Sequence, residues 1–323
     1  MKRIRAARRD RRRRGPAGRL SVMPMRLPSD RVISTRPVRP RFEKAQARLW
    51  FRGDRFRTAL FNAYLLLLCD EFEFVDIVRG YLPDVRDARL KDQLKGWLGQ
   101  EASHGVQHRK ACGYLDRMRL RYRGFHKVEN FLIFKMLCPL LGRKFRIALI
   151  AALEHINTMI GEMCLRRPDY FTGADAELGL LLKWHFAEEI EHRAVIHDVA
   201  QAVGVGYVTR LLAGAAAFGL YTWVWFFTAA WFAMQSCDAF RPSTYLQMLR
   251  FFFVEERFSQ ISLAYARDYL SPRFHPLDRD SDRFAEPVFR HLVPASASSG
   301  GTSAPGRPGP ASFRSPTNQE TRS

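Results

Sequence analysis

Two short motifs place a glutamate and a histidine three residues apart. The first runs from Glu101 to His104 and the second from Glu189 to His192, and each falls in a long stretch of helical periodicity. Because residues three apart share one face of an α-helix, each motif directs a carboxylate and an imidazole into the same space. One such pair alone is more often an ordinary surface pair than a metal site. Two copies predict a shared metal centre if further acidic side chains face them.

Two other predicted helices each contain a single glutamate among apolar neighbours, Glu71 and Glu154. An unpaired carboxylate buried among apolar side chains is costly, and a metal ion removes that cost. The order along the chain is then Glu, Glu-x-x-His, Glu, Glu-x-x-His. Ferritin-like proteins that bind two iron or manganese ions have this ligand pattern. The predicted ligands of a dinuclear centre are Glu71, Glu101, His104, Glu154, Glu189 and His192.

Three further histidines lie close to these ligands in the sequence. His108 and His185 fall one helical turn from the motifs on the same face. Each is a candidate nitrogen ligand or a partner that orients a ligand, and a core histidine bonded to a backbone carbonyl is the alternative of equal weight. His155 directly follows Glu154 and points away by roughly 100°. It is therefore expected to have a structural or supporting role rather than to bind metal.

Neighbouring acids and one tyrosine need separate interpretations. Glu154 is preferred to Glu162 as a ligand, because its helical neighbours are small or apolar whereas Glu162 falls nearer Arg166. Glu73 is expected on a solvated face. Tyr64 lies two turns before Glu71 on the same stripe, and a core aromatic is preferred there to a hydrogen-bond partner of the site.

Long helical periodicities dominate the chain, and strand signals are scarce. The predicted fold is all-α, a ferritin-like four-helix bundle over about residues 56–205 with additional C-terminal helices, one of them strongly apolar. Separations of 30 residues from Glu71 to Glu101 and 35 from Glu154 to Glu189 suit antiparallel neighbours that meet at mid-height. The four predicted bundle helices cover residues 56–79, 85–115, 143–167 and 174–203.

An uncharged run at residues 211–235 follows the predicted bundle and is long enough to cross a hydrocarbon layer of about 30 Å. It indicates either a membrane-spanning or membrane-embedded helix, or a helix buried against the bundle or in a homodimer interface. The apolar helix is predicted over about residues 207–235 and an amphipathic helix over 242–270. Together with the bundle they complete a predicted helical di-metal domain at residues 42–272.

Positive charge is concentrated near the N-terminus. The first 57 residues contain 20 Lys and Arg against 4 Asp and Glu, which accounts for most of the net charge of +20. Residues 1–41 are predicted to be a disordered basic arm, and residues 273–323 a mostly disordered tail. The arm has neither aromatic interleaving nor a folded motif, so specific nucleic-acid binding is not expected. Five widely spaced cysteines without a CxxC pair indicate a reducing cytoplasm. The apolar run at residues 211–235 allows a cytoplasmic protein to associate with the inner membrane.

Four segments resemble a family of bacterial proteins catalogued as predicted metal-dependent hydrolases, across about residues 30–270. They are CDEFEFVDIVR, GQEASHGVQH, ALEHINT and WHFAEEIEHRAV. The resemblance implies a metal-dependent hydrolase. These proteins have a small residue before the first glutamate, where this chain has Asp70, so it stays open whether Asp70 or Glu73 shares the role of Glu71. The His-x-x-x-Glu-x-x-His from His185 to His192 also resembles the di-iron arylamine N-oxygenases, and this implies that His185 binds one iron.

Three functions follow from such a centre. In a hydrolase, two metal ions roughly 3.5 to 4 Å apart polarise the substrate and lower the pKa of a bridging water. Four carboxylates with imidazoles inside a bundle instead favour two divalent ions of iron, with manganese or zinc as alternatives, and an O₂-activating oxidase or N-oxygenase. A non-catalytic metal-binding or membrane-associated protein is the third possibility. The sequence names no small-molecule substrate, although its aromatic runs hint at an apolar one.

Overall fold

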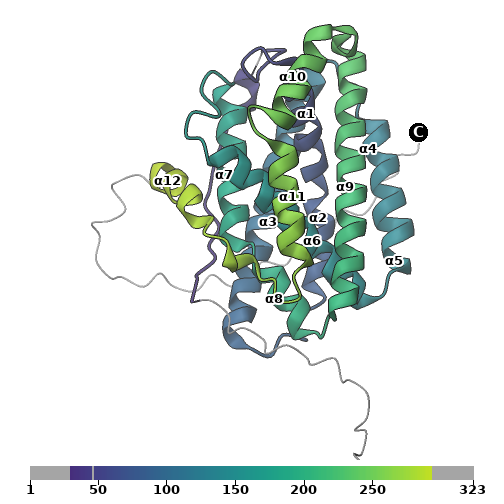
Figure 1. Ribbon diagram of the computed structural model, residues 1–323, viewed down its shortest axis with the longest axis vertical. Coiled ribbons are helices and arrows are strands. Elements are labelled where there is room, and N and C mark those ends of the chain that lie inside the picture. Colours follow the sequence, from purple (N-terminus) through teal and green to yellow (C-terminus); the bar gives the residue numbers. More distant parts are fainter. Residues whose placement is uncertain (1–29, 46, 293–323) are drawn as a thin grey trace, which may run out of the picture. The chain divides into compact units, whose positions relative to one another are not determined.

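The computed structural model describes residues 30–45 and 47–292. Within these residues the regular structure is helical, apart from an isolated β-bridge between Phe51 and Ala174 (Figure 1). The all-α fold predicted from the sequence is therefore confirmed. The ferritin-like class within it stays a prediction.

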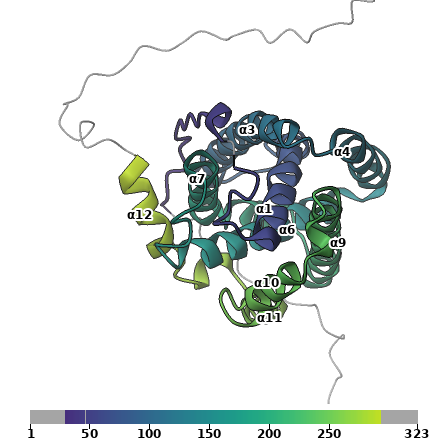
Figure 2. The ribbon, with the colours of Figure 1, turned by 90° about the horizontal axis from the view of Figure 1, so that it is seen from above.

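A central bundle surrounds the predicted metal ligands. Figure 2 shows α1, α3, α6 and α7 around a common interior. Helix α3 contacts α7 and α8, α6 contacts the same two helices from the other side, and α2 contacts both α3 and α6. The segments of this bundle are α1 (Arg55–Leu67), η2 (Leu68–Asp70), α2 (Glu71–Arg79), α3 (Ala88–Arg117), α6 (Arg143–Leu165), α7 (Ala176–His192) and α8 (Val195–Ala202).

Aspartates fix the starts of three bundle helices. The side chain of Asp54 accepts a hydrogen bond from the backbone N–H of Arg57, and Asp87 accepts one from Leu90, so each satisfies a donor that the first turn leaves free. Asp175 caps α7 in the same way. These caps place the helix starts within three residues of the starts predicted from the sequence.

The first and fourth predicted helices are each interrupted beside a predicted ligand. The 3₁₀ segment η2 separates α1 from α2 and ends at Asp70, directly before Glu71. Helix α7 ends at His192, and α8 begins at Val195. The apolar periodicity continues across both breaks, which is why the sequence predicted uninterrupted helices at 56–79 and 174–203.

Helix α9 (Tyr207–Gln235) is one uninterrupted helix on the outer side of α1 and α6 (Figure 1). Both α9 and α6 are long and apolar enough to cross a membrane, but the most apolar window of α6 is 89% buried and that of α9 only 28%. Helix α6 is therefore a core helix, whereas membrane contact through α9 stays a prediction. Flotation with phospholipid vesicles tests it: the purified protein should float with the vesicles, and should do so less after Trp223→Glu.

The remaining helices differ from the sequence prediction in extent. The amphipathic helix predicted at 242–270 consists of two helices joined at Arg257, which has a left-handed backbone conformation with φ of +53°. A further helical arm after α3 was not predicted at all. The arm consists of α4 (Arg123–Asn130), the π-helical η3 (Phe131–Leu137) and α5 (Cys138–Leu140). The two helices joined at Arg257 are α10 (Pro242–Phe253) and α11 (Phe258–Leu270). Short 3₁₀ turns are η1 (Phe42–Lys44), η4 (Asp238–Phe240) and η5 (Pro276–Asp278).

An N-terminal segment, residues 30–41, lies against α3 and α7, although the sequence assigned it to the basic arm. It runs so close to α3 that a Cβ atom at Gly96 would lie 2.3 Å from the carbonyl oxygen of Ile33, and one at Gly99 would lie 2.8 Å from Oγ1 of Thr35. The two glycines of α3 therefore make room for this segment. Residues 1–29, where the rest of the predicted arm falls, lie outside the described residues.

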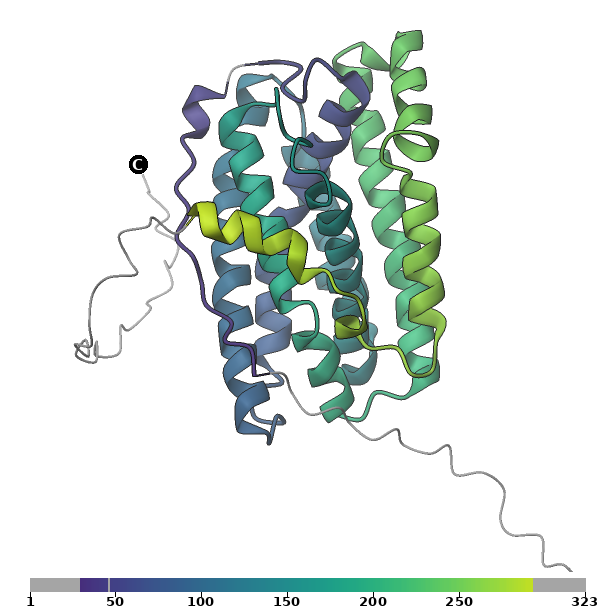
Figure 3. The same cartoon turned by 60° about the vertical axis from the view of Figure 1, so that its left-hand side comes forward.

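The C-terminal segment also differs from the prediction. Residues 282–292, assigned from the sequence to the disordered tail, form α12 (Asp282–Leu292), which packs across α7 (Figure 3). Arg193, at the end of α7, is buried and pairs with Asp282 of α12 at 2.7 Å. Arg31 of the N-terminal segment pairs with the same aspartate. The first and last described segments are thus paired beside α7, and the tail predicted for residues 293–323 lies outside the described residues.

Candidate metal centre

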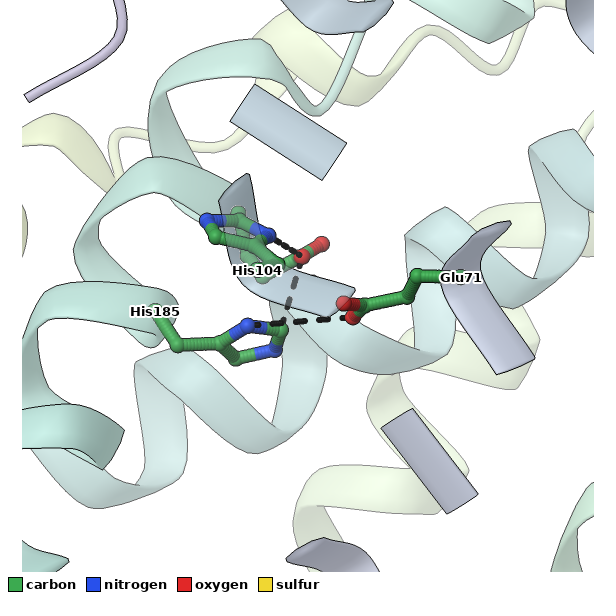
Figure 4. Close-up of side chains that lie close together, drawn as sticks. Glu71, His104 and His185 are labelled. Atoms are coloured by element: carbon green, nitrogen blue, oxygen red, sulfur yellow. Dashed lines mark ion pairs between the residues drawn. The ribbon is translucent and has the colours of Figure 1, made fainter. Parts of the chain in front are cut away.

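The structure brings all six predicted ligands, together with His185, into two adjoining groups. Within each group the ligand atoms lie within 4.8 Å of one another, and every side chain is at most 1% exposed. Figure 4 shows Glu71 and His185 turned toward one another, with His104 beside them. The first group contains Glu71, His104, His185 and Glu189, and the second contains Glu101, Glu154, Glu189 and His192.

Glu189 belongs to both groups because its two carboxylate oxygens face opposite ways. Its Oε1 lies 3.6 Å from Nδ1 of His104 and 3.5 Å from Nε2 of His185, while its Oε2 lies 3.2 Å from Nε2 of His192. A carboxylate in this position can bridge two cations, one in each group. The sequence predicted Glu189 as a ligand but gave no indication that it is shared.

Contacts of His192 and Glu101 close the second group. Nε2 of His192 lies 3.1 Å from Glu154 Oε2 and 3.3 Å from Glu101 Oε1. The same oxygen of Glu101 lies 3.4 Å from Nδ1 of His104. The two groups are therefore adjacent, and Glu101 lies at the boundary between them.

Many of these polar atoms have no hydrogen-bond partner among the described residues. Such atoms are rare in protein interiors, since burying them unpaired is costly. A pair of divalent cations would satisfy them, and carboxylate oxygens and imidazole nitrogens are suitable donors for iron, manganese or zinc. The donor set therefore fits two metal ions. The unpaired atoms are both oxygens of Glu71, Oε1 of Glu101, Glu154 and Glu189, and Nδ1 of His104 and His185.

The pKa values of these side chains indicate the same excess of buried negative charge. Burial, reinforced by the Glu101 and Glu189 carboxylates, raises the pKa of Glu71 well above its usual range. Burial and Glu154 raise the pKa of Glu189 to about 8. Burial lowers the pKa of His104, but the Glu101 and Glu188 carboxylates outweigh it and raise this pKa to about 10. The raised pKa values mean that these side chains tend to bind protons, and cations in the two groups would take the place of those protons.

Glu188, which the sequence analysis did not select, holds the imidazole of His104. Its Oε2 lies 3.0 Å from Nε2 of His104, and the side chain is fully buried. A hydrogen bond donated by Nε2–H to this carboxylate leaves Nδ1 free to face the first group. The other oxygen of Glu188 accepts a hydrogen bond from the backbone N–H of Arg36 at 3.2 Å. The N-terminal segment thus supports a ligand through Glu188.

Gln100 and Trp97 support the second group from α3. Nδ1 of His192 lies 2.9 Å from Oε1 of Gln100, whose amide nitrogen donates to Glu191 at 2.8 Å. Trp97 donates its indole N–H to Oε2 of Glu154 at 3.1 Å. Each of these two predicted ligands, His192 and Glu154, is therefore oriented by a second buried side chain. Both supporting residues lie within one turn of Glu101, a position that the sequence could have marked.

Replacing Glu188 with glutamine should weaken metal binding about 10- to 100-fold, the usual cost of losing a partner behind a metal-binding histidine. The substitution keeps the side-chain volume but removes the charge that fixes the His104 tautomer. Titration with Fe²⁺ in competition with a chromophoric chelator would measure the affinity. Glu177→Gln, on the same helix but bonded to the backbone of Arg41, is the matched control. Equal affinities of the two variants would contradict this role of Glu188.

Tyr64 has both of the roles that the sequence left open. It is fully buried in the hydrophobic core, and its hydroxyl lies 3.3 Å from Nε2 of His185 and 3.4 Å from Oδ1 of Asn157. If the hydroxyl donates to Asn157, it can accept the Nε2–H of His185. This tautomer leaves Nδ1 of His185 facing Glu71, at 3.8 Å from Oε1.

The other predicted candidates lie outside the two groups. His108 is buried with its ring centre 5.0 Å from that of His185, so it lies behind that histidine. His155 packs among Tyr265, Tyr269 and Phe274. Glu162 accepts hydrogen bonds from Tyr265, Arg166 and Arg279. Burial by itself raises the pKa of Glu162, but these contacts outweigh it and lower the pKa to about 2. The structure therefore places Glu154, and not Glu162, at the centre.

The two acids considered as alternatives to Glu71 also point elsewhere. Glu73 pairs with Lys135 at 2.8 Å. Asp70 accepts a hydrogen bond from Asn130 at 2.8 Å and lies in a small separate cluster with His126 and Glu129. This cluster was not predicted, because no helix was expected from the sequence at residues 123–140.

The fold and the buried site define an all-α protein with a cluster of carboxylates and imidazoles suited to metal ions. The chain belongs to the family described as "Predicted metal-dependent hydrolase", whose model matches residues 34–280. The matched region includes every side chain of both groups. Comparisons with curated proteins and with solved structures found no match.

Proposed function

We propose that the protein is an enzyme in which the two groups hold two divalent cations that act together on one substrate. The observation on which this rests is the shared position of Glu189, with one oxygen facing His104 and His185 and the other facing His192. The family description supports metal dependence. The buried carboxylate oxygens and imidazole nitrogens without a hydrogen-bond partner support two ions rather than one, because these atoms are distributed over both groups.

In this proposal each ion would have its own ligands, and two carboxylates would be shared by the two groups. Glu71, His104 and His185 would bind the first ion, and Glu154 and His192 the second. Glu189 would bridge them, and Glu101 lies at the boundary. When bound, such ions supply either redox chemistry with O₂ or activation of a water molecule, depending on the metal.

Oxidation with O₂ at two iron ions is the reaction that the donor set favours. Four carboxylates with three imidazoles are typical of iron or manganese in helical bundles. The ligands are at most 1% exposed, and Phe186 and Trp184 pack beside them, fully buried. Such a surrounding keeps bulk water away from the ions, which protects reactive oxygen species from side reactions.

Hydrolysis is the second candidate, because the family description names it. Zinc would then be the expected metal, and the bridging position of Glu189 would hold the two ions close enough to share a water molecule. The buried carboxylates would act as bases or orient the substrate. No separate nucleophile is needed for this chemistry.

Metal analysis combined with O₂ consumption distinguishes the two reactions. Protein purified without added metal is analysed for metal, then reduced anaerobically and exposed to O₂. About two iron ions per chain with O₂ uptake would support oxidation, and zinc without uptake would support hydrolysis. Bound iron with no uptake would instead favour a non-catalytic metal-binding protein and contradict the proposed oxidation.

A further inference from the structure

A cavity of about 200 Å³ lies between α6, α9 and α11. None of its lining residues belongs to either metal group. Glu154 belongs to the second group, whereas His155, the next residue of α6, lines the cavity. Consecutive residues of a helix point about 100° apart, so α6 presents these two side chains to different spaces. The cavity is therefore separate from the candidate metal centre.

Small residues on all three helices leave room for this cavity. Each helix lines it at spacings of three and four residues, which place the lining on one face of that helix. The small residues are Ala152 on α6, Gly214 and Ala215 on α9, and Ser262 and Ala266 on α11. A hollow forms because these positions of the three faces carry little side-chain volume.

Helices α9 and α11 contact each other at both ends of the cavity. At one end Tyr269 packs onto Gly214, where a Cβ atom would lie 2.3 Å from Cε1 of the tyrosine. At the other end the ring centres of Phe258 and Trp225 lie 6.2 Å apart. These aromatic contacts fix the distance between the two helices, so the small residues between them cannot close the space.

Ser262 carries a polar group in the lining that lacks a partner among the described residues. It is 8% exposed, and its Oγ makes no hydrogen bond to any described residue. Tyr265 and Tyr269 also line the cavity, but their hydroxyls donate to Glu162 and, at 3.3 Å, to a backbone carbonyl of α9. Nε2 of His155 donates to the carbonyl oxygen of Tyr265 at 3.4 Å. An unpaired buried hydroxyl is costly, and a ligand with a hydroxyl group would satisfy it.

Aromatic rings form much of the wall, and the cavity reaches the surface. The ring centres of His155 and Tyr269 lie 5.3 Å apart in a stacked arrangement, and Tyr265 lies 4.9 Å from the same imidazole. Phe218 and Leu270 line the cavity and are 41% and 58% exposed, so a ligand can enter between α9 and α11. Aromatic walls favour an aromatic ligand, because rings attract one another beyond the gain from burial alone.

We propose that this cavity binds a small phenol, with its ring against Tyr265 and Tyr269 and its hydroxyl on Oγ of Ser262. A cavity of roughly 150 Å³ binds one benzene molecule. The volume of about 200 Å³ therefore accommodates a single ring with a small substituent. This site goes beyond the proposed function, because it requires neither of the proposed cations.

Isothermal titration calorimetry with phenol and cyclohexanol tests the class of ligand. The two molecules have nearly the same size and the same hydroxyl, but cyclohexanol lacks the aromatic ring. The wild-type protein should bind one phenol per chain, about twofold to tenfold more tightly than cyclohexanol. Absence of phenol binding would overturn the site, and equal or tighter binding of cyclohexanol would overturn the aromatic class.

Ser262→Ala tests the contact with the hydroxyl of the ligand. This variant should bind phenol about tenfold more weakly, because the phenol hydroxyl would be buried without a partner. Toluene, which matches phenol in size but has no hydroxyl, should bind the variant at least as tightly as the wild-type protein. The melting temperature should not fall, since the substitution removes an unpaired buried hydroxyl. An equal loss of both ligands, or no loss of phenol, would overturn the role of Ser262.

Two bulky substitutions test the location of the site. Ala215→Phe on α9 and Ala266→Phe on α11 fill the cavity from different walls and should abolish phenol binding. Ala216→Phe and Ala264→Phe are the matched controls, because these alanines are exposed on the same two helices but do not line the cavity. Both controls should bind phenol as the wild-type protein does, and circular dichroism should show that all four variants are helical. Equal phenol affinities of the filled variants and their controls would place the binding elsewhere and overturn the proposal.

Discussion

Replacing either Glu101 or His192 with alanine is expected to reduce bound metal from about two ions per chain to less than one. His192 lies 3.1 to 3.3 Å from three carboxylates of the second group, so its loss removes the nitrogen around which that group is arranged. Glu101 lies 3.4 Å from His104 as well, so its loss affects both groups. Metal content is measured by mass spectrometry on protein purified under identical conditions.

Glu73→Ala is the matched control for both variants. Glu73 is an acid of α2 two residues from Glu71, but its carboxylate pairs with Lys135 on the outside of the bundle. The control should retain the metal content of the wild-type protein, and circular dichroism should show that all three variants are helical. Equal metal content in the three variants would remove Glu101 and His192 from the ligand set.

Helix positions and the grouping of the candidate ligands were predictable because one pattern encodes both. A buried glutamate or histidine must share the stripe of apolar residues that faces the core, so residues such as Glu71 and Glu154 could be assigned from their neighbours. The structure brings these residues together with the two Glu-x-x-His motifs. Glu154 could be distinguished from Glu162 on the same basis.

The roles of Glu188 and Gly96 were not predictable, since the partners of these two residues are remote in the sequence. Glu188 lies between Ala187 and Glu189 and resembles any other acid of that run, until Arg36 and His104 are seen on either side of it. In the sequence, Gly96 is simply a residue of low helix propensity. The structure shows that Ile33 lies too close to α3 for a side chain at this position. Contacts across more than 50 residues leave no local periodicity.

The helix breaks were hidden for a different reason. Apolar residues continue through η2 and across Arg193 at nearly the helical spacing, so the period alone indicates one helix in each case. Both breaks lie directly beside a predicted ligand, Glu71 or His192. Irregular turns of this kind are frequent at functional sites.

Removal of the metal should lower the melting temperature by roughly 8 to 16 °C. Ions present at about a thousand times their Kd stabilise a folded protein by about 4 kcal/mol, and each kcal/mol corresponds to roughly 2 to 4 °C in a domain of this size. The physical reason is that the metal-free protein must bury Glu71, Glu101, Glu154 and Glu189 without compensating cations. Differential scanning fluorimetry before and after chelation measures the shift.

The same measurement on Glu101→Ala shows whether the shift arises at this centre. Chelation should shift the melting temperature of this variant much less than that of the wild-type protein, because the variant no longer holds both ions. Metal-free Glu101→Ala should also melt at or above the temperature of the metal-free wild-type protein, since one of the crowded buried acids has been removed. A wild-type protein that loses its metal without any change in melting temperature would show that the four carboxylates do not depend on cations.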